Sequence, residues 1–239
     1  MAARSLEPDP GNAGVGMRTY RATDFRIATP AWLAMRDYFY VKGEMKMNHL
    51  KLRALCEGAI MVALATALSY VKFFELPQGG SVCIGMLPIL FYCTRWGLKD
   101  GLIASFAYGL LQLIFDGAYA WGWTSMLLDY LVAFSVLGFA GLFAHKKGGV
   151  FIGTVVGCVL RFIVHFISGI TIYRIYEPTE LFNTTFLNPY LYSAAYNGSY
   201  VAIDMVLCLV IFAVLYKPLK KYFTAADLRP AQAAQGAQE

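Results

Sequence analysis

Six runs of apolar residues, separated by short polar segments, occupy most of the chain. They cover residues 50–71, 82–96, 99–116, 124–144, 149–176 and 189–216. A helix needs about 20 apolar residues to cross the hydrocarbon core of a bilayer. The pattern therefore predicts an all-α integral membrane protein with six transmembrane helices. The second run is short and contains Pro88, so we expect a kinked or incompletely spanning helix there.

The two ends of the chain differ from this pattern. Residues 1–46 are polar and rich in Gly and Pro, and they lack the apolar core of a signal peptide. Such a segment is typical of a disordered extension, although "MNHLKLRALCEG", which begins at Met47, also resembles a natural start with a basic flank. We expect a membrane domain at 47–222 and a disordered tail at 223–239.

Composition agrees with a membrane location. Of the 239 residues, 58% are hydrophobic and only 15% are charged, whereas a soluble domain carries about 25% charged residues. The net charge of +5 does not indicate a nucleic-acid partner, because the positions of Lys and Arg matter more than their sum in a membrane protein.

The positions of Lys and Arg predict the orientation. If the N-terminus is cytoplasmic, the inside segments hold most of the basic residues, namely Lys42, Lys46, Lys51, Arg53, Arg95, Lys99, Lys146, Lys147, Lys217, Lys220 and Lys221. The outside loops hold only Lys72 and Arg174. This asymmetry predicts that both termini are cytoplasmic.

Four of the predicted helices carry polar residues in their outer halves. Asp129 and Tyr130 lie about 8–9 Å below the start of the fourth helix, at about 1.5 Å per residue. The third, fifth and sixth helices place further groups at a similar depth, namely Tyr108, Gln112, His165, Gly169, Tyr173, Tyr192 and Asn197. Ionisable groups are costly inside a membrane, so the set predicts a pocket open to the outside.

Each ionisable group also has a structural interpretation. His165 could be a core histidine bonded to a backbone carbonyl, and Asp129 could be the partner of Arg161. Arg161 lies one helical turn deeper than His165, and we interpret it as structural, with Asp204 or Glu57 neutralising its charge.

The chemistry of this pocket favours a flat, nitrogen-rich cation. One carboxylate suits a cation or an amino-heterocycle, and tyrosine rings offer faces for stacking and cation–π contacts. Tyr173 and Tyr192 have the alternative interpretation of aromatic residues at the membrane interface.

The first predicted helix carries a stripe of small residues. Ala59, Ala63 and Ala67 recur every four residues and so share one face. Small residues at this spacing let a second helix approach closely in lipid. The stripe predicts either packing within the bundle or docking to a separate membrane subunit.

The sequence contains no recognisable catalytic or nucleotide-binding motif. It has three histidines without HExxH spacing and five cysteines without CxxC spacing, which gives no support for a metal site. The glycines of "PQGGSV" lack the Lys-Ser/Thr of a P-loop. We therefore expect no enzyme activity and no cofactor bound by this chain, and any ATPase would be another chain.

Several segments together resemble the ThiT (YuaJ) thiamine transporters, the substrate-binding S components of energy-coupling factor (ECF) transporters. They are "EGAIMVALATALSY", "PQGGSVCIGMLPI", "RWGLKDGL", "LLDYLVAF", "LRFIVHFISG" and "YSAAYNGSY", in family order. The resemblance implies six helices in a bacterial cell membrane and an external thiamine pocket, with phosphorylated or related ligands left open. It also implies that the face of Ala59, Ala63 and Ala67 docks to a coupling subunit, whose ATPases use ATP.

The resemblance also implies a set of ligand-binding residues, which are Tyr108, Asp129, Tyr130, His165, Gly169, Tyr173, Tyr192 and Asn197. Some relatives carry Glu at the position of Asp129 and Trp at the position of Tyr108 or Tyr173. The turn-rich segment "FFELPQGGSV" is a candidate lid, and its candidate contact residues are Phe73 and Phe74.

Two other classes of protein remain as alternatives. A stand-alone transporter would couple thiamine uptake to protons through His165 or Asp129, although a chain of this length shows no inverted repeat. An intramembrane enzyme would need a nucleophile–base pair or a metal site, and the sequence supplies neither.

Overall fold

A computed structural model of the chain describes residues 49–76, 79–116, 122–176, 180–181 and 184–228, with the side chains of 172–185 left out. The chain divides into two units, Met1–Lys46 and Met47–Glu239. The predicted extension at 1–46 and most of the predicted tail lie outside the described residues. The described part continues past the predicted domain end at 222, through a series of turns that ends at Leu228, which is buried.

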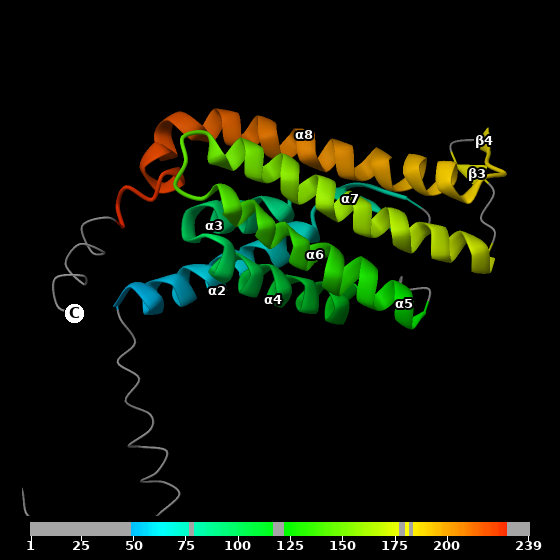
Figure 1. The fold of residues 1–239 in the computed structure, drawn as a ribbon, viewed down its shortest axis with the longest axis horizontal. Helices are drawn as coiled ribbons and strands as arrows, with labels where there is room; N and C mark the ends of the chain where they lie inside the picture. Colours follow the sequence, from blue (N-terminus) through cyan, green and yellow to red (C-terminus); the bar gives the residue numbers. More distant parts are fainter. Residues whose placement is uncertain (1–48, 77–78, 117–121, 177–179, 182–183, 229–239) are drawn as a thin grey trace, which may run out of the picture. The chain divides into compact units, whose positions relative to one another are not determined.

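The second unit is a bundle of helices (Figure 1). Its helical elements are α2 (His49–Ser69), α3 (Met86–Trp96), α4 (Leu98–Asp116), α5 (Trp123–Ser125), η2 (Met126–Val132), α6 (Ala133–Ser135), η3 (Val136–Phe143), α7 (Gly149–Tyr176) and α8 (Pro189–Phe223). Two short hairpins complete it, formed by β1 (Lys72–Glu75) with β2 (Ser81–Cys83) and by β3 (Glu180–Leu181) with β4 (Thr184–Thr185).

Within the described residues, five helices are long and apolar enough to cross a membrane. They are α2, α4, the continuous segment Trp123–Phe143, α7 and α8, which correspond to five of the six predicted runs. The remaining helix, α3, has only 11 residues, and at about 1.5 Å per residue it is much shorter than the bilayer core. It is short because β2 takes up the start of the predicted run, and because Gly97 at φ 92° ends the helix.

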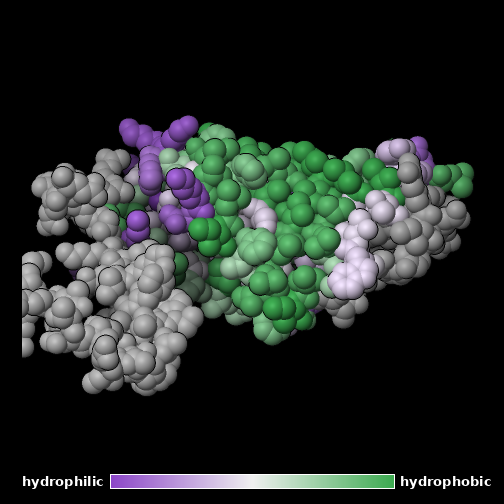
Figure 2. Space-filling model, turned by 60° about the horizontal axis from the view of Figure 1, so that its bottom comes forward, coloured by the Kyte–Doolittle hydropathy of each residue, from purple (hydrophilic) through white to green (hydrophobic). Residues whose placement is uncertain are grey.

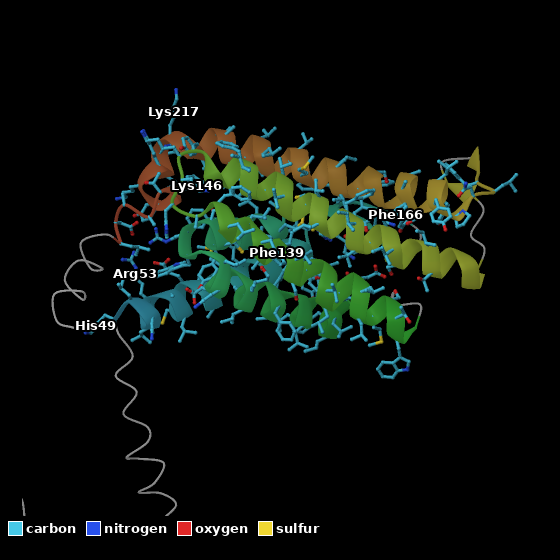
Figure 3. The ribbon with its side chains drawn as sticks, viewed as in Figure 1. His49, Arg53, Phe139, Lys146, Phe166 and Lys217 are labelled. Atoms are coloured by element: carbon cyan, nitrogen blue, oxygen red, sulfur yellow. The ribbon has the colours of Figure 1, made fainter. Side chains whose placement is uncertain are left out.

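The surface of this unit is divided between apolar and charged regions. Figure 2 shows a continuous hydrophobic face, with most of the strongly hydrophilic residues gathered at one end and a smaller group at the other. His49, Arg53, Lys146 and Lys217 lie at the end where α2 begins and α8 ends, whereas Phe166 lies toward the opposite end (Figure 3). This distribution is the one expected if that end faces the cytoplasm.

Helices α7 and α8 pack side by side along much of their length (Figure 1). Gly169 makes their close approach possible, because a Cβ at this position would lie 2.7 Å from Nδ2 of Asn197 and would also collide with Ser193. Polar pairs then join the helices. Ser193 donates to the carbonyl of Phe166 at 2.7 Å, and Asn197 donates to the carbonyl of His165 at 3.1 Å.

The β1–β2 hairpin was not predicted, since the sequence pattern gave only a turn-rich loop. Its strands pair antiparallel, with Glu75 opposite Ser81. Two backbone amides fix it to α8, because Gly80 N donates to the Tyr196 hydroxyl and Cys83 N donates to Asp204 Oδ1, each at 2.9 Å. The two candidate lid aromatics, Phe73 and Phe74, are 63% and 54% exposed and are not among the residues that line the cavity described below.

An ionic cluster joins α2, α3 and the turn after α8. Arg95, which is 2% exposed, donates to both oxygens of Asp227 at 2.8 Å and to Glu57 Oε2 at 2.8 Å. Glu57 also accepts from Trp96 Nε1 at 2.7 Å. The suggestion that Glu57 neutralises Arg161 is therefore wrong, because Glu57 is engaged at the other end of the bundle.

We expect Asp227→Asn to lower stability at neutral pH but not in strong acid. Hydrogen bonds from Arg95 lower the pKa of Asp227 to about 2, whereas an unperturbed Asp titrates at about 3.9. A carboxylate with a lowered pKa stabilises the fold above its unfolded pKa, and it loses this effect as the pH falls through the folded pKa. Thermal unfolding in detergent should therefore show a Tm difference between wild type and variant that is constant above about pH 5 and closes between about pH 4 and pH 2. A difference that persists at about pH 2 would show that the charge of Asp227 is not responsible.

Candidate ligand-binding site

A cavity of about 100 Å³ lies among the β1–β2 hairpin, α4, the segment Trp123–Phe143, α7 and α8. Seven of the eight predicted ligand residues line it, namely Tyr108, Asp129, Tyr130, His165, Gly169, Tyr192 and Asn197. The eighth, Tyr173, falls within α7, but its side chain lies outside the described residues. The structure thus brings together residues that are up to about ninety positions apart in the sequence.

The carboxylate of Asp129 is positioned by an irregular stretch of helix. Asp129 and Tyr130 lie in η2, a π-helical segment inside an otherwise apolar span. Such segments are rare and frequently occur at functional sites. Tyr130 donates its hydroxyl to the carbonyl of Asp116 at 2.6 Å, which fixes η2 against the end of α4.

Three side chains hold the Asp129 carboxylate. Ser125 and Ser168 both donate to Oδ2 at 2.7 Å, and His165 Nδ1 lies 3.0 Å from Oδ1. The side chain of Asp129 nevertheless remains 20% exposed, toward the cavity. Oδ1 therefore has capacity to accept a further hydrogen bond from a ligand.

The imidazole of His165 connects Asp129 to Arg161. Nε2 of His165 accepts from Nε of Arg161 at 3.2 Å, so Nδ1 carries the proton and donates to Asp129. Asp129 and Arg161 are thus linked through a neutral histidine and not by direct pairing. Both ring nitrogens of His165 are occupied, which leaves the ring surface for contact with a ligand.

Arg161 has its own counterion at the base of the cavity. Its Nη1 lies 3.8 Å from Oδ2 of Asp204 and also contacts the sulfur of Met86. The guanidinium lies 4.5 Å from the centre of the Phe134 ring, a cation–π geometry. Of the three partners proposed for Arg161 from the sequence, which were Asp129, Asp204 and Glu57, Asp204 is the one that the structure pairs with it directly.

A ladder of tyrosines follows α8 along one side of the cavity. Tyr192, Tyr196 and Tyr200 all line it, and each ring centre lies 5.9 Å from the next. Tyr200 also packs edge-to-face against His165 at 5.9 Å. The sequence pattern did not single out Tyr196 and Tyr200, although the three tyrosines follow one another at intervals of four residues, which places them on one helical face.

The charges that line this cavity do not balance. Among the described residues of its lining, Asp116 and Asp129 contribute two negative charges and Arg161 contributes one positive charge, which leaves a formal charge of −1 with His165 neutral. Two neighbours outside the lining add one charge of each sign and leave this sum at −1, because Lys72 pairs with Asp116 at 3.5 Å and Asp204 pairs with Arg161 at 3.8 Å. The lining therefore favours a ligand that carries one positive charge and presents flat rings to the tyrosines.

Comparison with known proteins identifies the family of this chain. Residues 55–224 match the family model of the thiamine transporter protein (Thia_YuaJ). The chain belongs to this family. It is 34% identical to the thiamine transporter ThiT of Bacillus subtilis, over 71% of this chain and 94% of the relative. It is 29% identical to the thiamine transporter ThiT of Lacticaseibacillus paracasei, over 75% of this chain and 94% of the relative.

The fold is also that of a solved Thia_YuaJ relative. A structure of ThiT from Listeria monocytogenes matches with a TM-score of 0.63 at 24% identity, covering 73% of this chain and 99% of that one. Membership of the Thia_YuaJ family confirms a multi-pass, helical membrane protein that is a transporter and not an enzyme.

We expect Gly169→Ala to act mainly through the packing of α7 against α8. The added methyl group would collide with Ser193 and Asn197, and overpacking of this kind costs about 1–3 kcal/mol. The matched control is Gly198→Ala on α8, where the nearest atom to an added Cβ is at an ordinary contact distance of 3.6 Å. Thermal unfolding in detergent should show a lower Tm for Gly169→Ala alone, and equal Tm values for both variants would contradict the packing role.

Proposed function

We propose that this protein binds thiamine in the cavity and serves as the substrate-binding S component of an ECF importer. The observation that carries the proposal is the Asp129 carboxylate, which is held by three side chains yet remains open to a cavity of net negative formal charge. The relatives named as thiamine transporters support the choice of ligand.

The chemistry of thiamine matches this lining. Thiamine joins a neutral aminopyrimidine to a thiazolium ring with a permanent positive charge. Asp129 accepts a hydrogen bond from the amino group, while the tyrosine ladder and the ring of His165 supply surfaces for the two flat rings. A phosphate ester would bring negative charge toward Asp116 and Asp129, so free thiamine is the preferred ligand.

The outer face of α2 supports docking to a coupling subunit. The buried face of this helix consists of Ala54, Gly58, Val62 and Ala65. The stripe formed by Ala59, Ala63 and Ala67 is exposed, so it does not pack within the described bundle. A partner helix could approach the backbone closely along this stripe. ATP hydrolysis would take place in separate subunits, because the sequence contains no P-loop.

Asp129→Asn should weaken thiamine binding by about ten- to a hundredfold, because a hydrogen bond to a charged group is worth about 1.5–3 kcal/mol. The measurement is equilibrium binding of thiamine to the purified chain, with riboflavin and biotin as comparison ligands. The matched control is Asp100→Asn at the start of α4, which removes an acid that does not line the cavity. Unchanged affinity in Asp129→Asn would exclude this carboxylate from the binding site.

Ala63→Trp should abolish thiamine uptake in cells and leave thiamine binding by the purified protein intact. The bulky ring would hold a partner helix away from α2, whereas Ala63 does not line the cavity, to which α2 contributes Ser69 at its C-terminal end. Uptake and binding are measured for the same variant. The control is Ile103→Trp on α4, which is 64% exposed and should retain both activities.

Two results would contradict the S-component proposal. Retention of uptake in Ala63→Trp would show that this face is not needed for transport. Accumulation of thiamine by the chain reconstituted without ATPases would instead favour the proton-coupled transporter.

A further inference from the structure

Asp204 is a fully buried acid, and contact with the cavity does not account for its burial. It lies on α8 with 0% exposure and does not line the cavity. One of its oxygens, Oδ1, accepts the backbone amide of Cys83 at 2.9 Å. The other, Oδ2, has no hydrogen-bond donor among the described residues and faces Nη1 of Arg161 at 3.8 Å.

Asp204 is therefore the first group in a series of polar contacts that leads to the carboxylate of Asp129. The first contact joins Asp204 to Arg161, and the second joins Arg161 Nε to His165 Nε2 at 3.2 Å. The series ends where His165 Nδ1 meets Asp129 Oδ1 at 3.0 Å. The β1–β2 hairpin is attached at one end through Cys83, and the cavity carboxylate lies at the other.

The charges along this series of contacts let Asp204 influence how much negative charge Asp129 presents to a ligand. Arg161 is 7% exposed, so its charge is screened weakly and needs a nearby anion. Two carboxylates compete for it, with Asp204 on one side and Asp129, through His165, on the other. While Asp204 holds the guanidinium, the charge of Asp129 remains available to a cationic ligand. Without Asp204, Arg161 would be drawn toward Asp129 and would offset that charge.

We propose that Asp204 is a positioning residue that couples the seating of the β1–β2 hairpin to the strength of ligand binding at Asp129. Its carboxylate places Arg161 and the Cys83 amide at the same time, so hairpin and binding site adopt their ordered arrangement together. This inference rests on the proposed function, because the ligand acting at Asp129 is taken to be the thiamine cation.

The test uses Asp204→Asn in the full chain. The amide keeps an acceptor for Cys83 N but removes the charge that faces Arg161. Thiamine affinity should fall by roughly tenfold or more, within the usual range of coupling between sites. In an Asp129→Asn background the same substitution should have little further effect, because the charge that Asp204 protects is already absent.

A second measurement follows the hairpin itself. Thiamine should slow hydrogen exchange at the amides of β2 in the wild type, and this protection should be lost in Asp204→Asn. The control is Cys208→Ala, one turn further along α8 and equally buried, which should lower Tm but retain both affinity and ligand-induced protection. Asp204→Glu keeps the charge and should restore part of the affinity.

The possible outcomes distinguish a failure of the coupling through Asp204 from a failure of thiamine binding itself. Wild-type affinity and protection in Asp204→Asn would overturn the coupling while leaving thiamine binding established by the wild type and by Asp129→Asn. Additive losses in the double variant would also overturn it. A wild type that does not bind thiamine would overturn both proposals.

If Asp204→Asn does not fold, Arg161→Lys replaces it. This variant keeps the positive charge and removes the Nε donor to His165, and it should show the same losses of thiamine affinity and of β2 protection.

Discussion

The ionised carboxylate of Asp129 lies within a span of apolar helix, and much of the surrounding structure follows from the partners that it needs. A charge in a weakly screened environment is tolerated only when it is paired and hydrogen-bonded. Ser125 lies on α5, whereas His165 and Ser168 lie on α7, so satisfying Asp129 joins two transmembrane segments at a defined height. Arg161 is hydrogen-bonded to His165, and its positive charge is in turn paired with the carboxylate of Asp204 on α8. Three segments are thus placed by one chain of polar contacts.

The same contacts show why a binding site and its scaffold are difficult to separate in this bundle. Asn197 was predicted as a ligand residue, but its amide donates to the His165 carbonyl and its oxygen accepts from Tyr200 at 2.9 Å. Gly169 was predicted in the same set, and it permits the close packing of α7 on α8. These residues line the cavity and also hold its walls together. Their substitution would change the shape of the site even where they do not touch a ligand.

The sequence predicted which helical positions share the depth of the site better than it predicted the backbone conformation there. Apolar period and helix rise were sufficient to place Asp129, His165 and Asn197 at one level, because both depend only on regular helix geometry. The π-helical segment around Asp129 and the β1–β2 hairpin could not be predicted this way, since both depend on contacts with distant residues. Gly80 illustrates the point, because a Cβ there would lie 2.8 Å from the Tyr200 ring, a constraint that only the folded structure reveals.

The two ends of the bundle have complementary roles. At one end Arg95, Glu57 and Asp227 tie α2, α3 and the turn after α8 together, and at the other end the cavity lies among α4, α7 and α8. Helix α2 is held by its small buried face, and the Tyr92 hydroxyl fits against it through the carbonyl of Ala54 at 2.8 Å. Its exposed alanine stripe therefore carries no part of the bundle's own packing. A partner could engage that stripe without disturbing the cavity, which is the arrangement that a subunit must have if it binds its ligand alone and transports it only in a complex.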